Sequence, residues 1–298
     1  MKIGWKPLIW SAAALLLLLS IPTPFIVITM FMIMTPFVVL FTTLSPARFA
    51  AHVIAIAAAA FFLLGGYGPI ALTIGLFFLV PSLAMGLFYK KGSPARTAIL
   101  AGFVVILAQF LLELVLFSVQ FDIDLSAELS GLLTTSLQQL GSDALLPQGW
   151  TVDMLSESFI TWLPTVILFF AFLFAVITHG LSRLALRTAG FEAPALPPAK
   201  TWRLPRSLVF YYLVAIIASF VVPENGGYWE VVIANLLPIL QFAFIIQAIG
   251  FFFFLADAKR WPSIAAVLLS VPLFLFPPLH LIGLIDAAYP LRRYFVKS

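Results

Sequence analysis

The chain has 298 residues, of which 63% are hydrophobic and only 9% are charged. Soluble globular proteins carry roughly 25% charged residues, so this composition excludes an ordinary water-soluble domain. The net charge of +4 does not indicate nucleic-acid binding, because the basic residues are distributed among short connections. The absence of cysteine excludes disulfides and thiolate chemistry.

Apolar runs follow one another along most of the chain, and they predict an all-α fold. The length allows a polytopic transmembrane helix bundle of about 8 to 10 membrane segments at roughly 20 residues each. Residues 8–44 are too long for one crossing, and Pro22 and Pro24 divide them into two spans, the first of which has no small-x-small cleavage site. Further spans are predicted over residues 49–64, 69–89, 97–121, 159–184, 207–222 and 229–256.

The last apolar stretch, residues 264–289, determines whether the number of crossings is even. A single crossing would place Arg292 and Arg293 on the side opposite to the other basic clusters. Pro277 and Pro278 interrupt the stretch and favour a helical hairpin, either as two tilted spans or as a re-entrant loop. We expect the hairpin, and therefore an even number of crossings.

All sixteen Lys and Arg residues fall at the chain ends or in one alternating set of connections. The other set carries acidic residues but no base. Cytoplasmic loops retain Lys and Arg, so both termini are predicted to be cytoplasmic in a multi-pass protein of the bacterial inner membrane. The basic clusters are Lys2 and Lys6; Arg48; Lys90, Lys91 and Arg96; Arg183, Arg187, Lys200, Arg203 and Arg206; Lys259 and Arg260; and Arg292, Arg293 and Lys297.

Two connections are long enough to have structure of their own. The outer loop 121–157 contains leucines at helical spacing over residues 125–140, which predict an amphipathic helix. The cytoplasmic linker 188–206 contains Pro194, Pro197 and Pro198, which indicate an extended segment. We interpret residues 1–298 as a single integral membrane domain, with a first helix set over 1–187 and a second over 207–298.

Glu113 is the clearest ionisable residue inside a predicted span, and such residues are candidates for function because their insertion is costly. At about 100° per residue, Gln109, Glu113 and Gln120 lie within about 40° of one another on one helix face. This stripe either binds a polar solute or a proton, or it is structural and hydrogen-bonds to amides of the span over 229–256. The candidate solute site comprises Glu113, Gln109, Gln120, Asn235 and Gln241.

A second candidate surface is basic. His179, Arg183 and Arg187 recur at every fourth position, and Arg203 and Arg206 follow in the linker. These residues either bind a cytoplasmic partner or anchor helices among lipid headgroups. Elsewhere, Asp286 is expected to form a local ion pair with Arg292 or Arg293, whereas His52 and His280 lack metal-ligand spacing, so no metal site is predicted.

The sequence lacks the motifs of several enzyme classes. It has no phosphate-binding P-loop, no zinc-protease helix, no nucleophile elbow and no kinase signature, and Glu113 has no second carboxylate beside it. We therefore expect no enzymatic activity, no cofactor and no ATP hydrolysis by this chain itself.

Three short stretches together resemble a known family. They are residues 85–91 (MGLFYKK), 202–205 (WRLP) and 283–286 (GLID), the last followed by Arg292 and Arg293. They are similar to the YybS-like family of bacterial multi-span membrane proteins, which implies a helical protein of the cell envelope without an assigned reaction. That family is in turn distantly similar to the substrate-binding components of energy-coupling-factor transporters, which capture vitamins from outside and borrow an ATPase module. None of their binding residues can be assigned to this sequence.

Two functions follow from these observations. The first is a transporter-like membrane subunit that binds a small solute from the outer side and has a cytoplasmic ATPase module or another membrane subunit as its partner. The second is a non-transporting scaffold that recruits cytoplasmic proteins through Arg183, Arg187, Arg203 and Arg206. In both cases the lipid bilayer surrounds it, and nucleic acid is not expected as a partner.

The predicted orientation can be tested by cysteine labelling, because the chain has no cysteine of its own. A membrane-impermeant maleimide should label Lys200→Cys only after the cells are permeabilised, whereas Ser136→Cys in the outer loop should react in intact cells. Labelling of Lys200→Cys in intact cells would show that the orientation is inverted.

Overall fold

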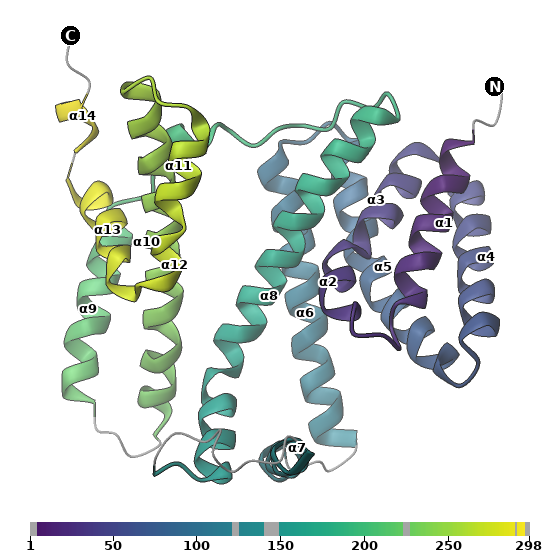
Figure 1. Cartoon of the computed structure of the whole chain (residues 1–298), viewed down its shortest axis with the longest axis horizontal. Coiled ribbons are helices and arrows are strands. Elements are labelled where there is room, and N and C mark those ends of the chain that lie inside the picture. The colour runs from purple at the N-terminus through teal and green to yellow at the C-terminus, as the bar shows by residue number, and fades with distance from the viewer. Residues whose placement is uncertain (1–4, 121–124, 140–148, 223–226, 290, 296–298) are drawn as a thin grey trace. The chain divides into compact units, whose positions relative to one another are not determined.

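The computed structural model describes residues 5–120, 125–139, 149–222, 227–289 and 291–295, and every regular element in these ranges is a helix (Figure 1). This confirms the predicted all-α fold. Residues 121–124 and 140–148 of the predicted outer loop lie outside the described ranges. The amphipathic pattern over 125–140 is confirmed as helix α7, Leu125–Gln139.

The chain divides into two compact units. Unit 1 comprises residues 1–123 and 167–196, and unit 2 comprises residues 124–166 and 197–298. One boundary falls within the predicted linker 188–206. Another falls within the 37-residue helix α8, Val152–Thr188, whose first part belongs to unit 2 and whose last part belongs to unit 1.

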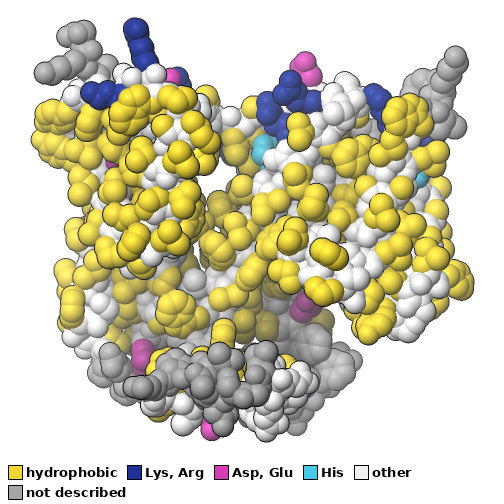
Figure 2. Space-filling model, in the orientation of Figure 1, with side chains coloured by type: hydrophobic (Ala, Val, Ile, Leu, Met, Phe, Trp, Pro, Cys, Tyr) yellow, Lys and Arg dark blue, Asp and Glu magenta, His cyan; other side chains and the backbone are white. Residues whose placement is uncertain are grey.

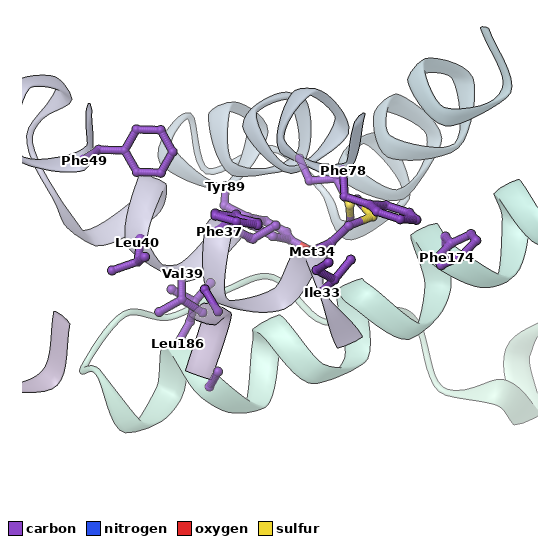
Figure 3. Packing of buried hydrophobic residues seen from close by; sticks show 14 of the residues in the cluster. Ile33, Met34, Phe37, Val39, Leu40, Phe49, Phe78, Tyr89, Phe174 and Leu186 are labelled. Atoms are coloured by element: carbon purple, nitrogen blue, oxygen red, sulfur yellow. The ribbon is translucent and has the colours of Figure 1, made fainter. Parts of the chain in front are cut away.

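Unit 1 is built around α3, Met34–Thr43, of which every residue except Phe41 and Thr43 is buried. Figure 3 shows α3 side chains packed between Phe78 and Tyr89 on one side and Phe174 and Leu186 of α8 on the other. The remaining helices of unit 1 are α1 Lys6–Leu19, α2 Ile26–Thr29, η1 Met30–Met32, α4 Pro46–Leu64, η2 Gly65–Tyr67, α5 Gly68–Lys90 and α6 Ala95–Gln120.

Small residues let the helices of unit 1 approach closely. A Cβ at Gly86 would lie 2.6 Å from the Phe41 ring, and a Cβ at Gly102 would lie 2.6 Å from the Met85 sulfur. The hydrophobic effect does not bring apolar helices together in a membrane, because lipid tails are as apolar as the helix surfaces. Close packing is therefore a main source of stability.

Unit 2 is built around α10, Tyr228–Ala258, which contacts α9, α11, α13, α14 and η4. Its other elements are α7, the first part of α8, η4 Ala199–Thr201, α9 Ser207–Val221, α11 Ser263–Ser270, α12 Pro272–Leu275, η5 Pro277–Leu279, α13 His280–Ala288 and α14 Arg292–Phe295. A buried apolar cluster in this unit includes Tyr212 and Ala215 of α9 and Phe244 of α10.

Five helical segments of the described residues are long and apolar enough to cross a membrane: residues 26–43, 46–90, 95–116, 152–188 and 228–258. The segment over 46–90 contains two helices, α4 and α5, that pack against each other. Three further apolar helical segments, over residues 6–19, 207–221 and 263–275, are shorter. The total of about 8 to 10 membrane segments and the side on which the termini lie stay predictions.

The last apolar stretch is broken, as its prolines predict. Helix α12 ends before Phe276, which is extended, and Pro277 begins a single 3-10 turn that leads into α13. After this break the chain returns along α10, and Arg292 of α14 donates to the carbonyl oxygen of Lys200 at 2.6 Å. The C-terminal helix therefore lies at the end of unit 2 where η4 also lies.

Basic side chains lie at one end of the helices in each unit (Figure 2). In unit 1, Lys6 Nζ donates to the carbonyl oxygen of Thr188 at 2.9 Å, and Lys90 Nζ donates to that of Leu44 at 3.3 Å. These bonds join the start of α1 to the end of α8 and the end of α5 to the end of α3. We call this the basic end of unit 1.

Gly283→Ala is expected to destabilise unit 2, because a Cβ there would overlap the carbonyl oxygen of Phe244 and approach its carbonyl carbon to 2.8 Å. Helix α13 would have to move away from α10, at a cost of about 1 to 3 kcal/mol for overpacking. A thermal melt of the purified protein in detergent should show a lower midpoint.

Gly180→Ala in α8 is the matched control, since no atom lies within 4 Å of the Cβ it adds and alanine favours helix. Its midpoint should be unchanged or higher, and an equal loss in both variants would contradict the explanation by packing.

Candidate functional site

The predicted polar stripe on α6 is partly buried in unit 1. Gln109 Nε2 donates to the carbonyl oxygen of Phe77 at 3.0 Å, whereas its Oε1 is buried and has no hydrogen-bond partner among the described residues. Glu113, one helical turn further on, is half-buried. The side chain of Gln120 lies outside what the structure describes. The stripe therefore contains one unsatisfied acceptor beside one carboxyl group.

Asn235 lies in unit 2 and is fully engaged in hydrogen bonds. Its Nδ2 donates to the carbonyl oxygens of Thr161 (2.7 Å) and Val231 (2.8 Å), and its Oδ1 accepts from the N–H and hydroxyl of Thr165 at 2.9 and 2.7 Å. In an uninterrupted helix the carbonyl of residue 161 pairs with the N–H of residue 165. The amide of Asn235 thus bridges two groups of the α8 ladder next to Pro164, which is a structural role.

Gln241 is also on α10, where it is half-buried. The five residues of the predicted solute site are thus divided, with Gln109, Glu113 and Gln120 in unit 1 and Asn235 and Gln241 in unit 2.

A buried ion pair lies at one end of unit 2, as predicted for Asp286. Arg292 Nη2 donates to Asp286 Oδ2 at 2.7 Å, and only 4% and 1% of the two side chains are exposed. Arg292 also donates to the carbonyl oxygens of Lys200 and Trp202 at 2.6 and 2.9 Å, and its guanidinium lies 5.2 Å from the centre of the Phe254 ring. The pair is therefore supported by backbone and aromatic contacts.

Gln247 of α10 connects this ion pair to the linker. Its Nε2 donates to Asp286 Oδ2 at 2.5 Å, and its Oε1 accepts from the backbone N–H of Leu204 at 2.8 Å. The side chain is 1% exposed. Two of the stretches singled out in the sequence, residues 202–205 and 283–286, thus meet at one amide group.

Two tyrosine–histidine pairs were missed by sequence reasoning, because their members are far apart along the chain. In unit 1, the Tyr89 hydroxyl lies 2.7 Å from His179 Nδ1. In unit 2, the Tyr212 hydroxyl lies 2.6 Å from His280 Nε2, and His280 Nδ1 lies 2.6 Å from the carbonyl oxygen of Pro277. A carbonyl only accepts, so His280 Nδ1 carries a proton, and in the neutral tautomer Nε2 accepts from the Tyr212 hydroxyl.

Near His179, helix α8 carries buried polar groups that lack partners. The hydroxyls of Thr178 and Ser182 are fully buried and have no hydrogen bond among the described residues, and the same is true of Arg183 Nε. The hydroxyls stand one turn apart in an apolar run, which is the only sequence signal that would have found them. In the part of the chain that the structure describes, no group of three His, Cys, Asp or Glu could hold a metal ion.

The predicted partner-binding residues differ in exposure. Arg187, Arg203 and Arg206 are exposed, whereas Arg183 is half-buried. Between them in sequence, Lys200 forms an exposed ion pair with Asp257 at 2.8 Å.

Comparison with known proteins assigns the chain to a family. Residues 11–287 match the family described as "Predicted membrane protein (DUF2232)", so the chain belongs to that family and is an integral membrane protein. It is 25% identical over 224 residues to "Uncharacterized protein YybS" of Bacillus subtilis (strain 168), a match that covers 71% of this chain and 72% of the relative. The expected resemblance to the YybS-like family is confirmed. No solved structure matches the chain. The distant similarity to energy-coupling-factor components stays a prediction.

Arg292→Met should strongly destabilise unit 2, because it leaves the Asp286 carboxylate buried without its cation. Loss of one partner of a buried pair costs about 3 to 5 kcal/mol. The double variant Arg292→Met with Asp286→Asn should recover part of this loss, since it removes the uncompensated charge and keeps an acceptor for Gln247.

Thermal melts in detergent measure the difference, with Lys200→Met as the control. That variant breaks only the exposed pair with Asp257, worth about 0 to 1 kcal/mol. A double variant no more stable than Arg292→Met would argue against a charge-based explanation.

Proposed function

We propose that this member of the DUF2232 family binds a small polar solute within unit 1 and serves as a transporter-like membrane subunit rather than as an enzyme. The observation that carries the proposal is the location of unsatisfied polar groups. Among the described residues, the buried side-chain atoms without a hydrogen-bond partner belong to Thr35, Gln109, Thr178, Ser182 and Arg183, all of them in unit 1.

An unsatisfied buried polar group costs about 1 to 3 kcal/mol, so it persists where function requires it. Gln109 Oε1 is an acceptor, and the carboxyl of Glu113 one turn away is a second acceptor when ionised. The complementary solute therefore carries N–H or O–H donors, and an ammonium group would suit Glu113 best.

The position of Glu113 along α6 supports entry of the solute from the end of unit 1 that is opposite to the basic end. Helix α6 begins at Ala95 near that end, and Glu113 lies 18 residues further, which is about 27 Å at 1.5 Å per residue. The hydrocarbon core is roughly 30 Å thick. With the basic end in the cytoplasm of a bacterial cell, a solute would reach Glu113 from outside.

The proposed site is narrower than the sequence alone predicts. Asn235 is left out because its amide is already engaged within unit 2, and Gln241 belongs to the same helix. Transport would require a partner, either a cytoplasmic ATPase module or another membrane subunit, since the chain lacks a P-loop.

A scaffold that recruits cytoplasmic proteins is a second candidate, favoured by one specific observation. The guanidinium groups of Arg187, Arg203 and Arg206 are exposed, and no ion pair within the described residues neutralises them. An acidic segment of a cytoplasmic protein would complement them.

Ligand-dependent thermal shifts distinguish the two candidates. We expect at least one compound from a panel of amino acids, polyamines and polyols to raise the melting midpoint of the wild type. Glu113→Gln and Gln109→Leu should each weaken its binding about tenfold or more, because each removes a buried hydrogen-bond partner.

Gln138→Leu is the matched control, since Gln138 is exposed on α7 and should not affect binding. If no compound stabilises the wild type, and an acidic protein copurifies with it but not with Arg203→Gln/Arg206→Gln, the scaffold replaces the solute-binding proposal.

A further inference from the structure

Unit 1 contains an apolar crevice that the proposed solute site does not use. Helices α1, α3 and α8 and the 3-10 turn η1 line this open crevice, which has a volume of about 490 Å³. Its walls include Trp10, Leu17, Pro36 and Leu181. A cavity of this size is within the range of about 300 to 1,000 Å³ that binds small organic molecules.

The crevice is elongated along the helices and begins near the basic end. On α1 its walls run from Trp10 to Leu17, and on α8 from Thr188 back to Leu181. Each run covers eight residues, whose ends are about 10 Å apart along the helix axis. Helix α1 starts at the basic end and α8 finishes there, so both runs extend from that end into the apolar part of unit 1.

Cations stand at the end of the crevice that Thr188 lines. Lys6 Nζ donates to the carbonyl oxygen of Thr188 at 2.9 Å, and the neighbouring Arg187 is exposed. Neither forms an ion pair within the described ranges. A negative charge placed at this mouth would be attracted by both.

One wall residue has a polar group that lacks a partner. Thr35 is 6% exposed and lines the crevice, and its hydroxyl has no hydrogen bond among the residues described. Thr35 lies nine residues, or about 13 Å of helix rise, from the Leu44 end of α3, so it belongs to the deep part of the crevice and not to its mouth.

We propose that the crevice is a specific site for one anionic phospholipid. An acyl chain lies between α1 and α8, and the phosphate binds Lys6 and Arg187 at the basic end. The site is separate from Gln109 and Glu113, so it does not depend on the proposed solute binding.

Native mass spectrometry of the full-length protein in detergent tests the proposal, with phosphatidylglycerol and phosphatidylcholine of identical acyl chains as probes. We expect one molecule of phosphatidylglycerol to bind, with phosphatidylcholine at least tenfold weaker. Lys6→Gln/Arg187→Gln should weaken phosphatidylglycerol binding by roughly thirtyfold, as expected when two cations at an anionic headgroup are lost. Lys91→Gln/Arg96→Gln removes the same charge from exposed positions of the same unit and should leave binding unchanged.

A second pair of variants tests the crevice itself without a change in charge. Ala13 lines the cavity, so Ala13→Phe should fill it and abolish the bound lipid. Ala12→Phe adds the same ring to an exposed position on the same helix and should retain the lipid. All variants should keep the melting midpoint of the apo protein, which separates a lost site from a lost fold.

Three results would overturn the proposal: equal affinity for the two lipids, equal loss in both charge variants, or lipid retained by Ala13→Phe. Displacement of the lipid by millimolar inorganic phosphate would also overturn it, since it would show that the headgroup alone is recognised.

Discussion

A polar group inside a bilayer must find its partner within the protein, because no water is present in the hydrocarbon core. Among the described residues of unit 2, each buried side-chain nitrogen or oxygen has a hydrogen-bond partner. The amide of Asn235 bridges the α8 ladder beside Pro164, and Gln247 joins the Asp286–Arg292 pair to the linker. Each of these contacts also fixes one helix against another, so the same bonds that satisfy the polar groups determine how α10 is packed.

Unit 1 departs from this pattern, and the departure gives it functional interest. Its apolar core around α3 is densely packed, yet unsatisfied acceptors and donors remain on α3, α6 and α8. Packing alone does not require them, because apolar side chains of similar volume would fill the same space without the cost of an unpaired group. The proposed solute would supply a partner for one of these groups, the Oε1 of Gln109.

Much of the fold could be predicted from the sequence, because hydropathy and chain length determine where apolar helices begin and end. The predicted runs over 69–89 and 229–256 correspond closely to α5 and α10, even though Pro81 and Pro238 lie inside these helices. The broken C-terminal stretch and the Asp286 ion pair were predicted from local signals, a proline pair and a short spacing. Tyr89 and His179 are 90 positions apart, and Asn235 is 70 or more positions from the α8 residues that it bridges. No local sequence pattern encodes such contacts.

The family-like stretches acquire a physical meaning in the structure. Gly283 lets α13 lie against the backbone of α10, and Asp286 accepts hydrogen bonds from Arg292 and Gln247. In residues 202–204, the carbonyl oxygen of Trp202 accepts from Arg292, and the N–H of Leu204 donates to Gln247. In unit 1, the Gly86 and Tyr89 positions of residues 85–91 fit against Phe41 and His179. These stretches therefore encode helix packing rather than a ligand site. The residues that we propose to bind solute and lipid, Gln109, Glu113, Lys6 and Arg187, lie outside these stretches.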